Sequence, residues 1–163
     1  KTWDKVTYYG MGPQESYRDK HQASSHGLYH SKVADLHEDY IRPQENGSHY
    51  DCDFVTVGNS NSGITVVSEN PFSFNASVYT QEELERVAHN YELEESDSTV
   101  LCIDYAQNGI GSNSCGPEVL EKYRLDEEKE TATEHGNSSM LAELQEQLRI
   151  SVAQYTKFVS ACC

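Results

Sequence analysis

Alternating apolar and polar residues, separated by turn-forming residues, dominate the first two-thirds of the chain. Residues 3–13 (WDKVTYYGMGP) are typical of a strand that ends in a Gly/Pro turn. Residues 51–70 predict a hairpin whose turn is the polar run NSNSG. The same alternation predicts further strands over residues 72–80 and 98–106. The hydrophobic pattern therefore predicts a mainly β body.

One stretch of this body has helical periodicity instead. In TQEELERVAHNYEL, Thr80 precedes Glu83 by three positions, which is the spacing of a capping box. Four apolar residues recur at helical spacing on the expected inner face: Leu84, Val87, Ala88 and Tyr91. We therefore expect one short helix near residues 80–91. Residues 14–47 are polar and without a sustained period, which predicts an irregular segment with a short helix or an extended crossing piece at residues 31–40.

The composition changes after Leu125. Residues 126–139 are charged and polar, which indicates an acidic linker. Beyond them, five apolar residues return near helical spacing: Leu141, Leu144, Leu148, Tyr155 and Phe158. The chain is thus predicted to have a β body at 1–125, an acidic linker at 126–139 and an amphipathic helical tail at 140–163.

The net negative charge of the chain excludes some classes of binding partner. The 163 residues suffice for one domain and carry 27 Asp and Glu against 12 Lys and Arg, for a net charge of −15. Nucleic acids and anionic membranes bind basic surfaces, so the charge argues against both as partners. A neutral ligand such as a sugar remains compatible with this composition.

Cysteine usage bears on the compartment. The five cysteines form no CxxC pair: they are Cys52, Cys102, Cys115, Cys162 and Cys163. A reduced chain located in the cytoplasm is the simplest interpretation. Neither a signal peptide nor a transmembrane segment is visible, and three N-glycosylation triplets, at Asn46, Asn75 and Asn137, are weak indications of secretion.

Two polar clusters are candidates for ligand chemistry. Several histidines precede residue 50, but none has HExxH spacing, and we predict no metal site in this chain. The run RPQENGSHYD offers hydrogen-bonding partners for sugar hydroxyls: Arg42, Gln44, Glu45, Asn46 and His49. An equally weighted interpretation is a polar turn whose side chains satisfy its own backbone.

The second cluster is the loop GIGSNSCGPEVLEKYRL, which follows the predicted strand at 98–106. Its small residues favour either an ordinary turn or a loop whose backbone approaches a ligand closely. No activating base can be identified for Cys115, and no GxSxG nucleophile motif is present. Residue types alone favour the turn.

Five blocks occurring in order carry a resemblance: VTYYGMGPQESYRDK, GLYHSKV, YIRPQENGSHYD, FSFNASVYTQEELERVAHNYEL and IDYAQNGIGSNSCGPEVLEKYRL. Together they resemble the C-terminal β-sandwich domain, of the small-chain type, of the family 2 glycoside hydrolase β-galactosidases (lactases). The resemblance covers nearly all of residues 1–125. It implies an antiparallel β-sandwich that is the second half of a supersandwich similar to galactose mutarotase.

The resemblance also implies a function. Such an enzyme is a retaining hydrolase of terminal β-D-galactosides such as lactose, and its two catalytic glutamates lie on a TIM-barrel domain absent from this chain. Its Mg and Na sites lie in other domains. The chain alone would therefore be inactive and without a cofactor, with the remaining domains or a large subunit as its partner in an oligomeric enzyme. The residue before the Gly-Pro of the last block, here Cys115, would lie at the mouth of the galactose pocket, with Asn113 and Ser114 beside it.

The chain departs from the family pattern in two places. The family domain begins well upstream of Lys1, and after EKYRL it has a final Phe-rich strand where this chain has the acidic linker. Both departures bear on whether the piece folds alone, because an unpaired sheet edge would be exposed. An alternative function, based on the tyrosine-rich sheet and the run RPQENGSHYD, is a stand-alone carbohydrate-binding or structural β-sandwich module without enzymatic activity.

Overall fold

A single curved antiparallel sheet forms the body of the protein. The computed structural model describes residues 3–111, 118–125 and 148–151. The strands are β1 (Lys5–Gly12), β2 (Ser25–Lys32), β3 (Ser48–Gly58), β4 (Gly63–Ser77), β5 (Val100–Asp104) and β6 (Leu148–Ser151). The helical pieces are α1 (Gln81–Arg86) and the 3₁₀ turns η1 (Val33–Leu36), η2 (Asn90–Glu92) and η3 (Glu121–Tyr123). The predicted mainly β, antiparallel class is confirmed.

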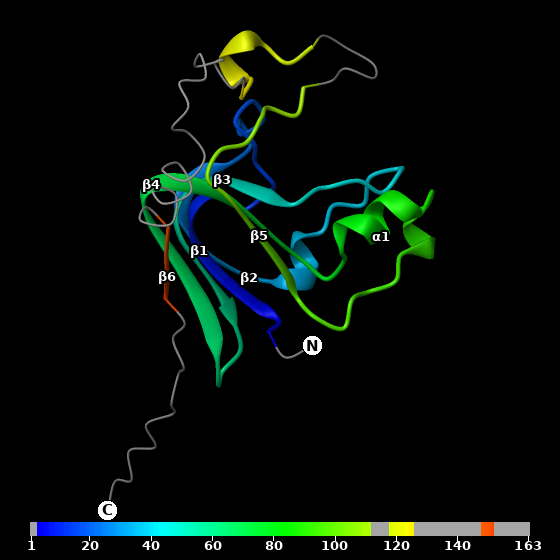
Figure 1. Cartoon of the computed structure of the whole chain (residues 1–163), viewed down its shortest axis with the longest axis horizontal. Coiled ribbons are helices and arrows are strands. Elements are labelled where there is room, and N and C mark those ends of the chain that lie inside the picture. The colour runs from blue at the N-terminus through cyan, green and yellow to red at the C-terminus, as the bar shows by residue number, and fades with distance from the viewer. Residues whose placement is uncertain (1–2, 112–117, 126–147, 152–163) are drawn as a thin grey trace, which may run out of the picture.

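The order of the strands is β2-β1-β3-β4-β5, and every described pairing is antiparallel. Strand β4 has two partners on its far side, because residues 65–68 pair with β6 and residues 73–77 pair with β5. Figure 1 shows β4 running the length of the curved sheet, with β5 crossing the upper part and β6 beside the lower part. These strands form one layer, so the second layer of the expected supersandwich stays a prediction.

The predicted strands on either side of Pro71 form one long strand. The ladder between β3 and β4 passes from Phe54↔Val67 to Cys52↔Phe72, so four residues of β4 oppose one residue of β3. Proline has no amide hydrogen for a ladder and is tolerated at a bulge. The bulge thus accommodates Pro71 without ending the strand, which the sequence pattern could not indicate.

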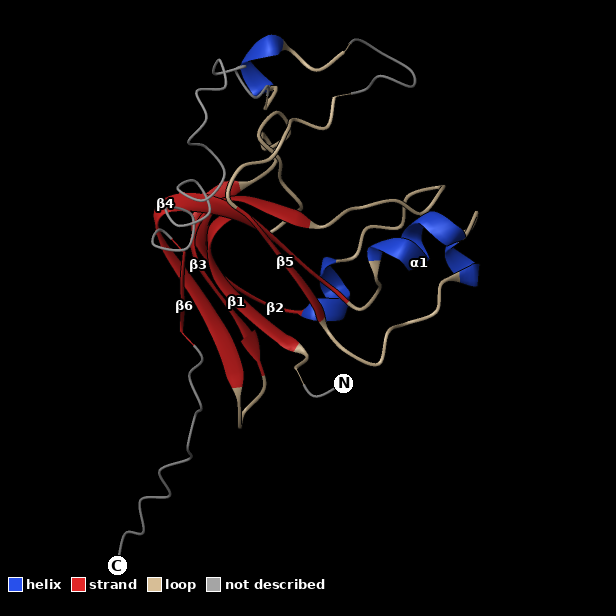
Figure 2. Ribbon diagram, viewed as in Figure 1, coloured by secondary structure: helices blue, strands red, loops and turns tan. Residues whose placement is uncertain are grey.

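The hydrophobic core lies on the inner face of the sheet. Its largest fully buried apolar side chains come from β1, β3, β4 and η1: Val6, Tyr8, Val33, Val55, Val57, Val66 and Phe74. The turn η1 contributes Val33 and Leu36, and it contacts both β2 and β4 (Figure 2). The sequence pattern predicts an irregular segment here, because Leu28 and Tyr29 are the only large apolar residues of β2 and its inner side chains are only half-buried. An edge strand of this kind has no apolar alternation to read.

Helix α1 is shorter than predicted. The Thr80 hydroxyl accepts a 3.1 Å hydrogen bond from the Glu83 amide, which confirms the predicted N-cap. Helix α1 ends at Arg86, because the Glu92 carboxylate accepts hydrogen bonds from the amides of Ala88 and His89 and turns the chain. Leu84 and Val87 are buried as predicted, whereas Ala88 and Tyr91 are exposed.

The predicted helical tail differs where the structure describes it. Residues 148–151 form β6, an edge strand paired with residues 65–68, and are not helical. Isoleucine and a short run without glycine or proline suit either state, and pairing with an exposed strand edge decides between them. The linker at 126–139 and the rest of the tail lie outside the described residues.

The outer face of the sheet carries an apolar row. Leu28, Tyr9, Phe54 and Val67 are consecutive cross-strand partners on β2, β1, β3 and β4, so their side chains share one face. Leu28 is 55 %, Val67 47 % and Tyr9 38 % exposed. Adjoining exposed apolar side chains of this kind are typical of an interaction surface.

Candidate functional site

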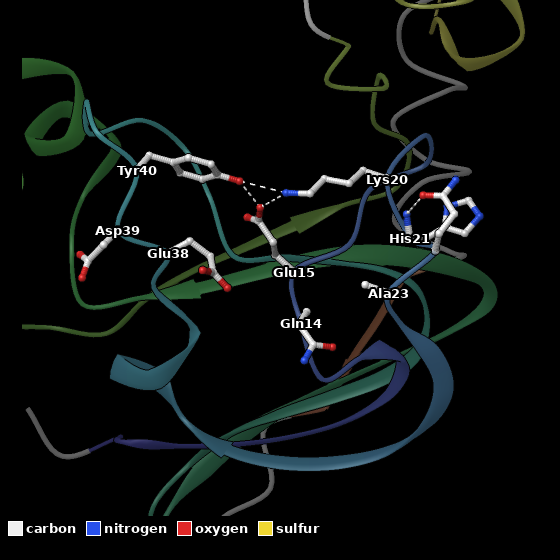
Figure 3. Close-up of a pocket in the computed structure, with 9 residues that line it drawn as sticks. Gln14, Glu15, Lys20, His21, Ala23, Glu38, Asp39 and Tyr40 are labelled. Atoms are coloured by element: carbon white, nitrogen blue, oxygen red, sulfur yellow. Dashed lines mark hydrogen bonds and ion pairs between the residues drawn. The ribbon is translucent and has the colours of Figure 1, made fainter.

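A buried carboxylate, Glu15, lies at the centre of a polar cluster beyond the end of β1. Its side chain is 5 % exposed. It accepts hydrogen bonds from the Tyr17 hydroxyl at 3.3 Å, from the Gly47 amide at 2.9 Å, and from Lys20 and Tyr40. Figure 3 shows Lys20 and Tyr40 pointing toward Glu15 from two different loops. The carboxylate thereby joins the loop after β1 to the loop that precedes β3.

Opposing effects set the charge of Glu15. Burial raises its pKa, but hydrogen bonds from Lys20, Tyr40 and Gly47 outweigh burial and hold the pKa below its ordinary value. Burial likewise lowers the pKa of Lys20, and its hydrogen bond to Glu15 outweighs that effect and raises it. Both groups are therefore charged near neutral pH. Four donors already bind the Glu15 carboxylate. Glu15 is therefore better suited to holding the two loops together than to acting as a catalytic acid or base.

A cavity of about 490 Å³ opens beside this cluster (Figure 3). Residues 14–15, 20–23 and 38–40 line it, and its wall carries both acidic and basic side chains. Across the described part of the chain, no three His, Cys, Asp or Glu side chains are arranged to hold a metal ion. The cavity is therefore a hollow between the loop after β1 and the loop that precedes β3.

Asn46, predicted as a sugar ligand, is buried and bonded to the backbone around it. Its side-chain oxygen accepts a 2.9 Å hydrogen bond from the Glu38 amide, and its nitrogen donates to the Gln44 carbonyl at 2.9 Å. Its own carbonyl accepts from the side chain of Asn75, which is also buried. This geometry matches the interpretation of a turn that satisfies its own backbone. Asn46 and Asn75 each begin a glycosylation triplet, and their burial shows that both side chains serve the fold.

His49, the second predicted ligand, is 1 % exposed and belongs to the aromatic core. Its ring centroid lies 4.4 Å from that of Tyr8 and 5.2 Å from that of Phe74. Nδ1 lies 3.1 Å from the Met11 carbonyl oxygen, and Nε2 is buried without a hydrogen-bond partner among the described residues. Burial lowers the pKa of His49 to about 4, so the ring is uncharged at neutral pH.

Glu45, the third predicted ligand, is exposed at the other side of this loop. Partial burial of its carboxyl group and the nearby charge of Asp104 raise its pKa. Asp104 ends β5, and burial raises its pKa as well. The side chains of Asn46 and His49 are therefore buried, whereas that of Glu45 is exposed near Asp104 at the end of β5.

The predicted rim residues Asn113, Ser114 and Cys115 lie outside the described residues. The segments on both sides of them are described, and they lie against each other. The Gly109 amide donates a 2.8 Å hydrogen bond to the Tyr123 carbonyl. A Cβ on Gly111 would lie 2.5 Å from a methyl carbon of Val119. We call residues 108–111 the first stem and residues 118–125 the second stem. The two stems contact each other and flank the predicted rim along the chain.

The glycines of the first stem are explained by the backbone and by packing, whereas the sequence suggested that they allow a ligand to approach. Gly111 has a φ of 56°, in the left-handed region that favours glycine. At Gly109, a Cβ would lie 2.7 Å from the Asp19 carboxyl carbon. Packing within the protein thus requires both glycines, independently of any ligand.

Sequence reasoning missed Glu15, Lys20 and Tyr40. Their chemistry depends on contacts between loops, and the chain is rich in acidic residues, so composition does not single out the buried one. The one local signal is the Gly-Pro turn at Pro13, which directs the following residues away from the sheet.

Comparisons with known proteins place this chain in a family. Residues 1–135 match the family model of the β-galactosidase small chain. A β-galactosidase of Actinobacillus pleuropneumoniae is 53 % identical over 125 residues, which are 77 % of this chain and 12 % of that protein. A β-galactosidase of Staphylococcus xylosus is 47 % identical over 125 residues, or 77 % of this chain and 13 % of the relative.

A more distant relative, the β-galactosidase of Kluyveromyces lactis, is 34 % identical over 125 residues, which cover 76 % of this chain and 12 % of the relative. The chain thus spans about an eighth of the length of the relatives it matches. The family match covers strands β1 to β5, the Glu15 cluster and both stems, whereas β6 lies beyond it. The chain belongs to the β-galactosidase small-chain family.

Proposed function

We propose that this chain is part of a larger β-galactosidase that hydrolyses terminal β-D-galactosides such as lactose. The family match over residues 1–135 carries the proposal, together with relatives that bear this name and of which the chain spans only 12–13 %. A segment of this size supplies part of an enzyme. The remaining domains, or a large subunit, are its partners in an oligomeric enzyme.

The role we assign to the chain is structural. Retaining hydrolysis needs two carboxylates held about 5 Å apart across the scissile bond. Glu15 is buried but already occupied by four donors, which leaves it unsuited to that role. The two catalytic glutamates belong to the TIM-barrel domain, and the chain alone is inactive. We place the Mg and Na sites of such an enzyme in its other domains.

The loop between the two stems provides the rim of the galactoside pocket. In this role Cys115, Ser114 and Asn113 border the sugar, and the paired stems hold the loop at the end of the sheet. The contacts of Gly109 with Tyr123 and of Gly111 with Val119 support this proposal, because a pocket wall needs a fixed base.

The outer face of the sheet supports the proposed partner. The apolar row of Leu28, Tyr9, Phe54 and Val67 is exposed in this chain, and most of the relatives' length lies outside it. We assign this face to contact with the rest of the same enzyme. The described cysteines, Cys52 and Cys102, are unpaired, in keeping with a location in the cytoplasm. Among the described residues, no helix is long and apolar enough to cross a membrane.

A stand-alone carbohydrate-binding module is the weaker candidate. It relied on Asn46 and His49 as sugar ligands, and both are buried and engaged with the backbone or the core. Arg42, Gln44 and Glu45 remain exposed in this run, but without Asn46 and His49 it offers fewer of the hydrogen-bonding groups on which the module depends.

The test is a chimaera. The matching segment of the Actinobacillus pleuropneumoniae enzyme is replaced by residues 1–125 of this chain, and hydrolysis of a chromogenic galactoside is measured. We expect the chimaera to be active, the enzyme lacking the segment to be inactive, and the isolated chain to be inactive. Turnover by the isolated chain after controls for contaminating enzyme, or an inactive but folded chimaera, would contradict the proposal.

A further inference from the structure

The side chain of Asp19 joins two parts of the molecule that are far apart in sequence. Its Oδ1 accepts a 3.0 Å hydrogen bond from the Ile110 amide, and its Oδ2 accepts a 2.9 Å hydrogen bond from the Gly111 amide. One carboxylate thus holds two successive amides of the first stem. Hydrogen bonds to an ionised acceptor are the stronger kind, and a pair of them fixes orientation as well as distance.

Gly109 makes this contact possible. A Cβ at this position would lie 2.7 Å from both Cγ and Oδ2 of Asp19, closer than real Cβ atoms approach other atoms. The stem therefore passes directly over the carboxylate, and any side chain at position 109 would displace it. The contact between Asp19 and the first stem therefore requires glycine at position 109.

The turn that presents Asp19 is itself held rigidly. Tyr17 and Lys20 exchange two backbone hydrogen bonds, of 2.7 and 3.1 Å, around Asp19. Both of their side chains also bond to the Glu15 carboxylate. Because Glu15 is anchored in turn to Gly47, a continuous set of contacts runs from the loop preceding β3 to the first stem.

From these contacts we propose that Asp19 is a positioning residue for the galactoside pocket: it fixes the first stem, which leads into the proposed rim, relative to the sheet. The inference rests on the proposed function. Asp19 touches neither the substrate nor the reacting atoms in this role. Loss of its carboxylate therefore weakens binding of the substrate in the ground state and the transition state alike, which raises KM and leaves kcat nearly unchanged.

The first experiment measures the contact without activity. Amide hydrogen exchange in the peptide covering residues 105–111 is compared between the chain and its Asp19→Ala and Asp19→Asn variants. We expect exchange to be faster by about tenfold in Asp19→Ala, and by less in Asp19→Asn, which keeps one acceptor oxygen. The control is Asp53→Asn, because Asp53 is a half-exposed strand residue remote from the stems. Unchanged exchange in both Asp19 variants would overturn the proposal.

A double-mutant cycle tests whether the contact is specific. Gly109→Ala should raise exchange in the wild-type chain, because the methyl group displaces the carboxylate. The same change should have little further effect in the Asp19→Ala background, where nothing remains to be displaced. Gly27→Ala is the matched control, since a Cβ there would lie at an ordinary 3.5 Å from Tyr29. Additive effects of Gly109→Ala and Asp19→Ala would also overturn the proposal.

The second experiment measures function in the active chimaera. We expect Asp19→Ala to raise KM by about tenfold while kcat changes by less than about twofold, with Asp53→Asn neutral in both. Faster exchange with unchanged KM, or a large loss of kcat at unchanged KM, would overturn the role at the pocket. An inactive wild-type chimaera would refute the proposed function, and with it this role, while exchange would still report the contact itself.

Discussion

The carboxylate of Glu15 accepts a 2.9 Å hydrogen bond from the backbone amide of Gly47, a residue 32 positions later. Gly47 has a φ of 71°, a left-handed conformation that orients its amide toward the carboxylate and that side chains other than glycine rarely adopt. This bond closes a loop whose other contacts, through Lys20 and Tyr40, are charged or polar. The stability of this end of the molecule therefore depends on one acidic group.

Replacing Glu15 by Gln should destabilise the chain by about 2 kcal/mol. The amide has one acceptor oxygen in place of two, and its NH₂ group would face donors in a buried site. Chemical denaturation measures the change. The matched control is Glu69→Gln on the exposed part of β4, which should be neutral within about 0.5 kcal/mol. Equal effects of the two variants would contradict the central role of Glu15.

His49 should make the stability of the chain sensitive to mild acid. Its pKa is about 4 in the folded protein, below the ordinary 6.5, so the unfolded chain binds more protons between these values. Stability from this group is complete above pH 6.5 and falls as the pH is lowered toward 4, by up to about 3 kcal/mol.

The measurement is the free energy of unfolding between pH 7.5 and 4 for the wild-type chain and for His49→Gln. We expect the variant to be less stable at neutral pH but to have a flatter profile over this range. His30→Gln, at an exposed position of β2, is the control and should keep the wild-type slope. A slope that His49→Gln leaves unchanged would show that other groups cause the acid sensitivity.

The apolar row on the outer face should matter for assembly more than for folding. Leu28 is 55 % exposed in this chain, so Leu28→Asp should change its melting temperature little. In the active chimaera, the same change would bury an unpaired charge against the rest of the enzyme and should lower thermal stability markedly. The control is Lys32→Asp, at the exposed last residue of the same strand. Equal sensitivity of chain and chimaera to Leu28→Asp would contradict the assigned contact.

Cys115 should tune substrate binding rather than chemistry. A tryptophan would offer a large stacking surface to a sugar ring, where cysteine offers a small polarizable one. In the chimaera, Cys115→Trp should therefore change KM more than kcat, and Cys115→Ser should retain most of kcat. Thermal melts serve as the folding control. A loss of kcat by several orders of magnitude in a folded Cys115→Ser protein would defeat the assignment to the rim and indicate a direct chemical role.

The sequence by itself determined the class of fold and several local features. Alternation in β1, β3 and β5 is legible because one face of each strand is turned to the core, and the Thr80 cap depends only on residues three positions apart. Ordered blocks along residues 1–125 were enough to identify the family, because sequence similarity needs no knowledge of contacts.

Tertiary structure alone decided the rest. Strand β2 forms because β1 offers it a backbone partner, and β4 continues past Pro71 because a bulge absorbs the proline. Asn46 and His49 carry polar groups that sequence reasoning assigned to a ligand, yet the fold turns both inward. Glu15 and Asp19 acquire their roles from donors that lie 32 and more than 90 positions away. Such contacts depend on how distant loops pack against each other, which no local sequence pattern indicates.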